Sequence, residues 1–299
     1  MERHSVSARP PVHGFGSSAL LLLVLLVSLL PAVSPGSGWL SAEAAGPIPD
    51  PADVASQVVA PPPGLVGWWP GDGDADDISG NGYGGLLQHG AGFAPGRVGE
   101  AFHLDGVSQY VLIPDSTANL DPNPLDPTVE ATLDAWVYFD QRPSDVGHIM
   151  TIVAKSGMGR DLDLQAETDD RFHFFVAGGA GAGGHVVSST TITPGRWYFI
   201  AATYEANHEI RVYVNGALET TVAIPGLQRL PNGNPVTIGE SYVFRGRFLS
   251  GLVDEVELFN RVLTPAEVRA IFEAGSAGKC KPGTCILSRF YLPLVQQRR

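Results

Sequence analysis

Short apolar runs separated by turn residues constrain the fold of this chain most. The clearest is residues 210–219, which read IRVYVNGALE, with Asn215-Gly216 as the pair that a two-residue type I′ hairpin turn requires. Other runs that alternate, or that are rich in aromatic and β-branched residues, are 101–113, 131–139, 162–167, 172–176, 197–204, 236–238 and 252–259. High counts of turn formers, Gly 36 and Pro 24, fit many short strands. This pattern predicts an all-β fold, an antiparallel two-sheet sandwich.

One segment near the end of this region predicts a helix instead. Thr264 suits the N-cap, Pro265 the first helical position and Glu267 the third, which is a capping-box arrangement. Val268 and Ile271 then lie on one apolar face. We expect about two turns of helix, ending near Gly275.

The N-terminus has the pattern of an export signal. Arg3 and Arg9 precede the apolar run 19–30, and Ala42-Glu43-Ala44 forms an A-x-A cleavage site. The alternative is a membrane anchor, but a spanning helix needs about 20 apolar residues and this run is shorter. We therefore predict a signal peptide and cleavage region over 1–44, a secreted protein and no transmembrane anchor.

The remaining chain divides by composition. Residues 45–63 are rich in proline and predict a linker, 64–274 carry the strand pattern and 275–299 form a C-terminal tail. The tail contains the two cysteines of the chain, Cys280 and Cys285, which in an exported protein predict a disulfide. Because both cysteines follow residue 274, we expect this bridge to hold the tail and to add little to the stability of the domain.

The charge balance excludes one class of partner. The formal net charge is −12, and no run of basic residues offsets it. Since an acidic surface repels phosphate backbones, we expect no nucleic acid partner.

Several strings occur in a fixed order across residues 65–272. They are LVGWWP (65–70), DISGNG (77–82), GEAFHLDG (99–106), AWV (135–137), VYVNG (212–216), GLVDEV (251–256) and NRVLT (260–264). Together they resemble the laminin-G-like jelly-roll domain of the concanavalin-A-like lectin/glucanase superfamily. That resemblance implies a jelly-roll sandwich with one short C-terminal helix.

The acidic strings bear on catalysis, because glucanases of this superfamily use carboxylates on one strand face. Glu255 and Glu257 share a face, but Asp254 does not, so the E-x-D-x-E pattern is broken. The acids of 161–167 also share a face, which the charged outer side of an edge strand explains equally well. We predict that the protein is not an enzyme. The alternatives are a glycoside hydrolase and a purely structural extracellular domain.

The resemblance also implies a structural Ca²⁺ in the DISGNG loop. Carried over by residue, its ligands would be Asp77, Asn81 and Asp254 with the carbonyls of Ile78 and Gly80. The competing interpretation is an Asx turn held by its own side chains.

Sugar binding requires exposed aromatic rings beside hydrogen-bonding side chains. The candidates are Trp68, Tyr83, His185 and Tyr242. We predict a secreted, non-catalytic binding or adhesion module whose partner is a glycan or an extracellular protein.

Overall fold

The computed structural model describes residues 58–116, 123–157, 161–178 and 183–283. The predicted signal peptide (1–44), most of the predicted linker and Cys285 lie outside these residues.

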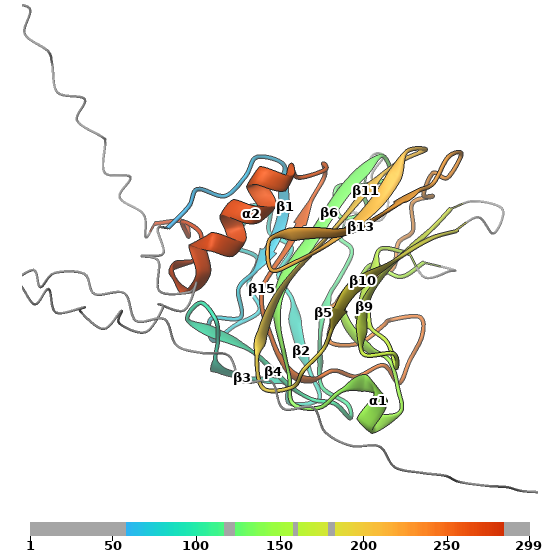
Figure 1. Cartoon of the computed structure of the whole chain (residues 1–299). Helices are drawn as coiled ribbons and strands as arrows, with labels where there is room; N and C mark the ends of the chain where they lie inside the picture. Colours follow the sequence, from blue (N-terminus) through green and yellow to red (C-terminus); the bar gives the residue numbers. More distant parts are fainter. Residues whose placement is uncertain (1–57, 117–122, 158–160, 179–182, 284–299) are drawn as a thin grey trace, which may run out of the picture. The chain divides into compact units, whose positions relative to one another are not determined.

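Two antiparallel sheets form the domain, as the strand pattern predicted (Figure 1). The larger sheet contains β1 (Leu65–Trp69), β3 (Gly92–Pro95), β4 (Glu100–Asp105), β6 (Glu130–Phe139), β11 (Trp197–Glu205), β12 (Glu209–Val214), β13 (Ala217–Ala223) and β15 (Ser250–Phe259). Its order is β13-β12-β11-β6-β15-β4-β3, with β1 also paired to β15.

The smaller sheet has seven strands in the order β10-β9-β8-β7-β14-β5-β2. They are β2 (Leu86–Gln88), β5 (Tyr110–Ile113), β7 (Met150–Ala154), β8 (Asp163–Ala166), β9 (Arg171–Ala177), β10 (Gly183–Thr191) and β14 (Val236–Ile238). The edge strand proposed for residues 161–167 is wrong, because β8 lies between β7 and β9.

The hairpin predicted at residues 210–219 is confirmed. Asn215 and Gly216 connect β12 to β13, and both have left-handed backbone angles, with φ of 50° and 75°. A type I′ turn requires these angles at both central positions.

The main core lies between the two sheets. It is built from large side chains such as Trp69 of β1, Phe102 of β4, Val111 of β5 and Phe174 of β9. Because side chains alternate across a strand, each of these strands also presents residues to the opposite face of its sheet. The two sheets differ in what covers this outer face.

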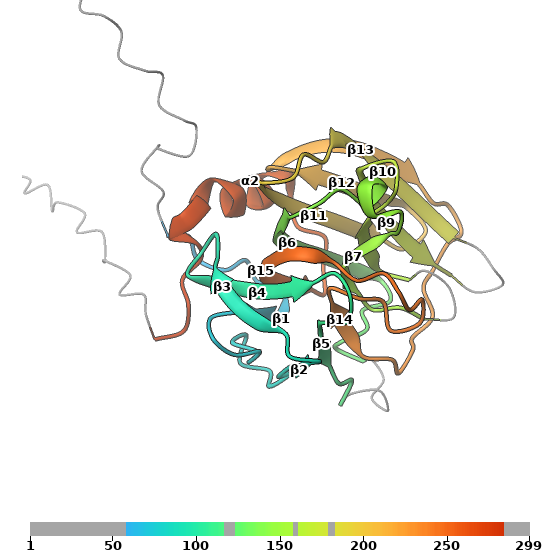
Figure 2. The same ribbon diagram turned by 90° about the horizontal axis from the view of Figure 1, so that it is seen from below.

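Helix α2 (Pro265–Ala274) covers part of the outer face of the larger sheet (Figures 1 and 2). Its Val268 and Ile271 pack with Trp136, Phe199 and Tyr213 in a second apolar cluster. The predicted capping box is confirmed: Thr264 Oγ1 accepts a hydrogen bond from the backbone N–H of Glu267. The structure adds the short helices α1 (Pro143–Val146) and η3 (Gly275–Ala277).

The packed domain continues past the predicted boundary at residue 274. Lys279 forms a parallel bridge with Val59, and its side chain is buried against the larger sheet. The first residues of the predicted tail, up to Lys281, therefore belong to the domain.

Candidate functional site

The outer face of the smaller sheet carries a row of aromatic and polar side chains. In β9, Phe172 and Phe174 point into the core, so the alternation places His173 and Phe175 on the outer face. His185 of β10 is the Cα partner of Phe175 and lies on the same face.

Three of these rings form a stack. The ring centroids of Phe175 and His185 are 4.0 Å apart with planes only 7° apart, and His173 stacks at 5.0 Å from His185. A hydrogen bond of 2.8 Å joins His173 Nδ1 to His185 Nε2, and His173 Nε2 lies 2.8 Å from Asp169 Oδ1. His173 is nearly buried, whereas His185 is exposed and Phe175 is half-buried. The stack therefore leaves parts of the His185 and Phe175 rings exposed at the outer face.

Polar side chains continue the row along β8 toward the 239–249 loop, where Gln165 is buried and Glu167 and Arg247 are half-buried. Gln165 Nε2 donates to Glu167 Oε1 over 2.8 Å, and Arg247 Nη1 donates to Gln165 Oε1 over 3.1 Å. The guanidinium of Arg247 lies 4.5 Å from the ring centroid of Phe244. We call Gln165, Glu167, His173, Phe175, His185 and Arg247 the outer-face strip.

The 239–249 loop is held in place from within. Both carboxylate oxygens of Glu240 accept backbone hydrogen bonds of 2.8 Å, one from Gly246 and one from Arg247. The backbone carbonyl of Arg247 in turn accepts from Thr151 N of β7. Burial raises the pKa of Glu240, although these N–H donors oppose the shift. The loop is thus an ordered part of the sheet surface.

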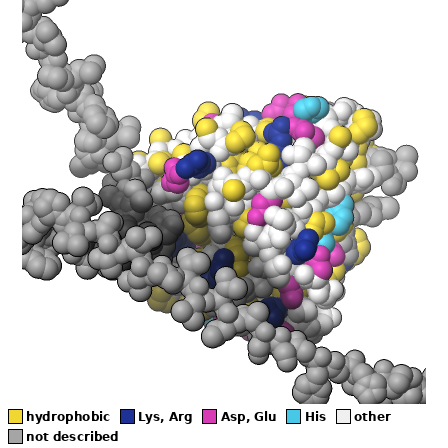
Figure 3. Space-filling model, in the orientation of Figure 1, with side chains coloured by type: hydrophobic (Ala, Val, Ile, Leu, Met, Phe, Trp, Pro, Cys, Tyr) yellow, Lys and Arg dark blue, Asp and Glu magenta, His cyan; other side chains and the backbone are white. Residues whose placement is uncertain are grey.

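Side chains of mixed kinds line the molecular surface. On the face shown in Figure 3, histidine side chains lie next to acidic and basic ones, with apolar patches between them.

Two of the four sugar-binding candidates are exposed on this side of the domain. His185 belongs to the outer-face strip, and Tyr242 lies in the 239–249 loop, 37% exposed. Tyr83 is half-buried and packs against the main core. The prediction that Trp68 is an exposed ring is wrong: it is 1% exposed, because Lys279 lies over its ring on the face opposite the core.

Sequence reasoning missed Phe175 and the two arginines of the loop. Phe175 stands in the apolar run 172–176, which predicts a strand. The sequence of this run does not indicate which face of the strand other segments cover. The spacing of His173 and Phe175 at i and i+2 places them on one face, and this was the available signal. Arg245 and Arg247 stand in a stretch without strand periodicity.

The proposed calcium ligands hold separate turns. Asp77 Oδ1 accepts backbone hydrogen bonds of 2.9 Å from Trp68 and Ser79, and its Oδ2 accepts one of 2.9 Å from Tyr83. The side-chain amide of Asn81 donates to Val66 O. These are contacts that an Asx turn makes.

Asp254, the third proposed ligand, holds the turn between β3 and β4. Its Oδ2 accepts backbone hydrogen bonds of 2.7 Å from Arg97 and 2.8 Å from Val98. Its Oδ1 is buried and has no hydrogen-bond partner among the described residues. Among the carboxylate oxygens of Asp77 and Asp254, only Asp254 Oδ1 accepts no hydrogen bond from the described residues. At each of the others, a cation would have to replace an existing hydrogen bond. Calcium at this set stays a prediction.

The acidic string 254–257 lies in the interior of the domain. Glu255 and Glu257 share a face as predicted, because Lys279 Nζ lies 3.2 Å from Glu255 Oε2 and 3.1 Å from Glu257 Oε2. Glu255 has a φ of 53° at an irregularity in the pairing of β15 with β6. Burial raises the pKa of Glu257 to about 7, and burial together with the charge of Glu257 raises the pKa of Asp134. These carboxylates form a sealed ionic cluster.

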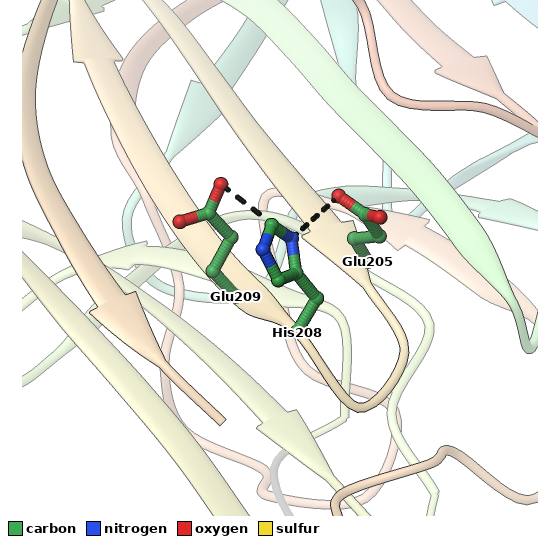
Figure 4. Close-up of side chains that lie close together, drawn as sticks. All are labelled: Glu205, His208 and Glu209. Atoms are coloured by element: carbon green, nitrogen blue, oxygen red, sulfur yellow. Dashed lines mark hydrogen bonds and ion pairs between the residues drawn. The ribbon is translucent and has the colours of Figure 1, made fainter. Parts of the chain in front are cut away.

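A second cluster of carboxylates and histidine lies at the tip of the β11–β12 hairpin (Figure 4). His208 Nδ1 lies 2.9 Å from Glu205 Oε2 and 3.7 Å from Glu209 Oε1. Glu209 also forms an ion pair with Arg211. Because Glu205 and Glu209 are directly opposed across the two strands, the ion pair of Glu209 with Arg211 offsets a repulsion between like charges. An ion-paired turn accounts for this group.

Comparison with known proteins agrees with the observed architecture. Residues 105–269 match the family described as the Concanavalin A-like lectin/glucanases superfamily. No curated protein sequence matches the chain. Among the described residues, no helix has the length and apolar character needed to cross a membrane.

Three solved structures illustrate the similarity. The binding domain of Paraclostridial Mosquitocidal Protein 1 has a TM-score of 0.59 and 16% identity, covering 70% of this chain and 52% of that one. The receptor binding domain of botulinum neurotoxin C/D mosaic serotype has a TM-score of 0.57 and 12% identity, covering 70% and 51%. This chain thus spans about half the length of each toxin domain. Domain 4 of AbnA, a GH43 extracellular arabinanase from Geobacillus stearothermophilus, was solved with arabinotriose. It has a TM-score of 0.50 and 19% identity, covering 69% and 96%.

Proposed function

Because this chain belongs to the concanavalin A-like lectin/glucanase superfamily, we propose that it is a secreted, non-catalytic carbohydrate-binding module. The observation that carries the proposal is the outer-face strip. A sugar ring has an apolar C–H face that packs on aromatic rings and a rim of hydroxyls that form hydrogen bonds. The strip offers both, with the Phe175–His185 stack near the half-buried carboxylate of Glu167.

The similar structures support this class of ligand. Domain 4 of the arabinanase was solved in complex with arabinotriose, and its fold covers 69% of this chain. The two toxin structures are binding domains by their descriptions. At these identities the likeness concerns the fold, so the ligand of this chain is inferred from its own strip.

The setting of the acidic string 254–257 does not favour catalysis. A retaining hydrolase needs two carboxylates about 5–5.5 Å apart that both reach the substrate. Glu255 and Glu257 are close together, but both are buried and both contact Lys279. A sugar could reach them only if the segment carrying Lys279 left the sheet. The hydrolase alternative is therefore less well supported.

Secretion rests on the N-terminal pattern of residues 1–44, and N-terminal sequencing of exported material tests it. Calcium dependence is a separate proposal, because the residues nominated as its ligands are not part of the strip.

Binding of the full chain to an array of neutral and acidic glycans tests the proposal. His185→Ala and Phe175→Ala should each weaken binding at least about tenfold, which corresponds to about 1.4 kcal/mol. The matched control is Leu218→Ala, which removes an exposed apolar side chain from β13 of the larger sheet and should bind like the wild type. Thermal melting of each variant shows whether the fold is intact.

Two results would contradict the proposal. One is no binding to any glycan on the array. The other is binding that both strip variants leave unchanged. Release of reducing sugar by the wild type, abolished by Glu257→Gln, would instead favour the hydrolase.

A further inference from the structure

Arg245 has an unusual setting at the end of the outer face. Its guanidinium carbon lies 5.0 Å from the ring centroid of Tyr242 and 5.6 Å from that of Tyr110. Tyr110 is buried at the start of β5 and is fixed by the sheet, whereas Tyr242 and Arg245 are exposed. Two tyrosines thus hold this cation at the surface, which lowers the entropy that it loses on binding a ligand.

No carboxylate among the described residues lies within ion-pair distance of Arg245. The loop's own acid, Glu240, uses both oxygens to accept backbone hydrogen bonds from Gly246 and Arg247. Burial raises the pKa of Glu240 and the charge of Arg245 opposes this shift, but no acceptor among the described residues forms a hydrogen bond or ion pair with this guanidinium, so it can meet an anion from outside. A planar guanidinium matches a carboxylate in a two-pronged geometry.

The neighbouring side chains indicate what kind of anion fits. Arg247 adds a second positive charge two residues away, in a chain whose net charge is −12. Tyr242 and Val243 are 37% and 39% exposed, which gives the same loop an apolar surface. An inorganic anion would use the charges and leave that surface uncovered. A sugar that bears a carboxylate would use both.

We propose that the 239–249 loop binds the carboxylate of an acidic sugar, with Arg245 pairing with the carboxylate and Tyr242 packing against the sugar ring. This inference rests on the proposed carbohydrate-binding function and names the class of sugar. The acidic group can come from a uronic acid or from a sialic acid, since both present a ring carboxylate.

The test compares matched acidic and neutral probes on the full chain. The probes are polygalacturonate, the same polymer after reduction of its carboxyl groups, a sialylated oligosaccharide and its desialylated form. We expect binding to at least one acidic probe, at least tenfold weaker binding to its neutral counterpart, and loss of this preference in Arg245→Gln. Which acidic probe binds identifies the source of the carboxylate.

The matched control is Arg196→Gln. Arg196 is also exposed and also lies over a tyrosine, with its guanidinium carbon 4.9 Å from the ring centroid of Tyr198. Both variants remove one positive charge, so a general charge effect would weaken the binding of acidic probes equally in both. We expect Arg196→Gln to keep the wild-type preference within about twofold.

An acidic preference that persists in Arg245→Gln would overturn the inference, and so would each of three further outcomes. Equal binding to acidic and neutral probes, unchanged in Arg245→Gln, refutes the acidic-sugar site and leaves the carbohydrate-binding function standing. Equal losses in the Arg245 and Arg196 variants show unspecific attraction and also refute it. Binding to none of the four probes, nor to the wider glycan array, removes both proposals together.

Discussion

The Nζ atom of Lys279 lies 3.1 Å from Oε2 of Glu257, and the exposed fraction is 2% for the lysine side chain and 0% for the glutamate. The same amine lies 3.2 Å from Glu255, so one cation from the predicted tail meets two acids of β15. Burial alone would lower the pKa of Lys279. The negative charges of Glu257, Glu255 and Asp134 outweigh this effect and raise that pKa. The C-terminal segment is therefore joined to the sandwich by an interior ionic contact.

Replacing Lys279 by methionine should destabilise the domain by about 3 kcal/mol or more, because it leaves buried carboxylates without their cation. Urea unfolding measures the loss. Lys281→Met is the control: this amine lies 2.8 Å from Glu255, but its side chain is 19% exposed, so we expect a smaller loss. A Lys279→Met protein within about 1 kcal/mol of wild type would mean that the cluster is neutralised by protons.

The contribution of Asp254 to the stability of the domain should fall as the pH rises from about 4 to 8. Burial, followed by the charge of Glu255, raises the pKa of Asp254 to about 8. In the unfolded chain an aspartate has a pKa of about 3.9, so folding favours the protonated form. This contribution is fully present below about pH 4 and is lost as the pH rises through 8.

Asp254→Asn should flatten this dependence, since an amide can still accept from Arg97 and Val98 but does not ionise. Thermal melting at pH 5, 7 and 9 gives the slope. Asp76→Asn, at an exposed position, should keep the wild-type slope. Parallel curves for the wild type and Asp254→Asn would show that Asp254 does not titrate in this range.

Calcium can be tested by its effect on melting. A cation that binds only the folded state stabilises it by about 2.7 kcal/mol at a hundredfold excess over Kd. If the predicted set binds calcium, millimolar Ca²⁺ should raise the melting temperature, EDTA should lower it, and Asp77→Ala should abolish both responses. Indifference of the wild type to Ca²⁺ and EDTA would leave the Asx turn as the account of this loop.

Asp77→Ala should be destabilising even in EDTA. It removes the acceptor of three backbone hydrogen bonds, from Trp68, Ser79 and Tyr83. Hydrogen bonds to a charged group contribute about 1.5–3 kcal/mol each, so we expect a loss of at least about 2 kcal/mol in urea unfolding. A loss of stability seen only in calcium-containing buffer would show that the main role of Asp77 is to bind the cation and not to hold the turn.

Reduction of the predicted Cys280–Cys285 disulfide should change the free energy of unfolding by less than about 2 kcal/mol, because the bridge closes a very small loop. Lys279 keeps its place without the bridge, since the backbone N–H of Cys280 donates to Val59 O over 2.8 Å. Urea unfolding with and without reductant measures the difference. Chemical labelling of both thiols before reduction would contradict the pairing itself.

Local features were predictable from the sequence with good detail. The Asn215-Gly216 turn and the Thr264 capping box depend on residues within a few positions of one another. Their backbone angles and hydrogen bonds therefore follow from residue type and spacing. The order of family strings likewise identified the two-sheet jelly roll.

The exposure of individual side chains was less predictable from the sequence. Trp68 and Phe175 each stand in a strand and alternate with core residues, so the sequence places both on a face opposite the core. Lys279, far away along the chain, covers Trp68, whereas Phe175 stacks with His185 at the surface. Strand periodicity assigns a side chain to a face but cannot say what lies over that face.

The sequence by itself determined the fold class, the hairpin, the terminal helix and the pairing of Glu255 with Glu257 on one face. Only the tertiary structure decided that this acidic pair is sealed by Lys279 and that His185 and part of Phe175 stay exposed at the β9–β10 side of the smaller sheet. The reason is physical: turns, caps and strand alternation arise from short-range backbone geometry, whereas exposure depends on contacts between segments distant in the chain.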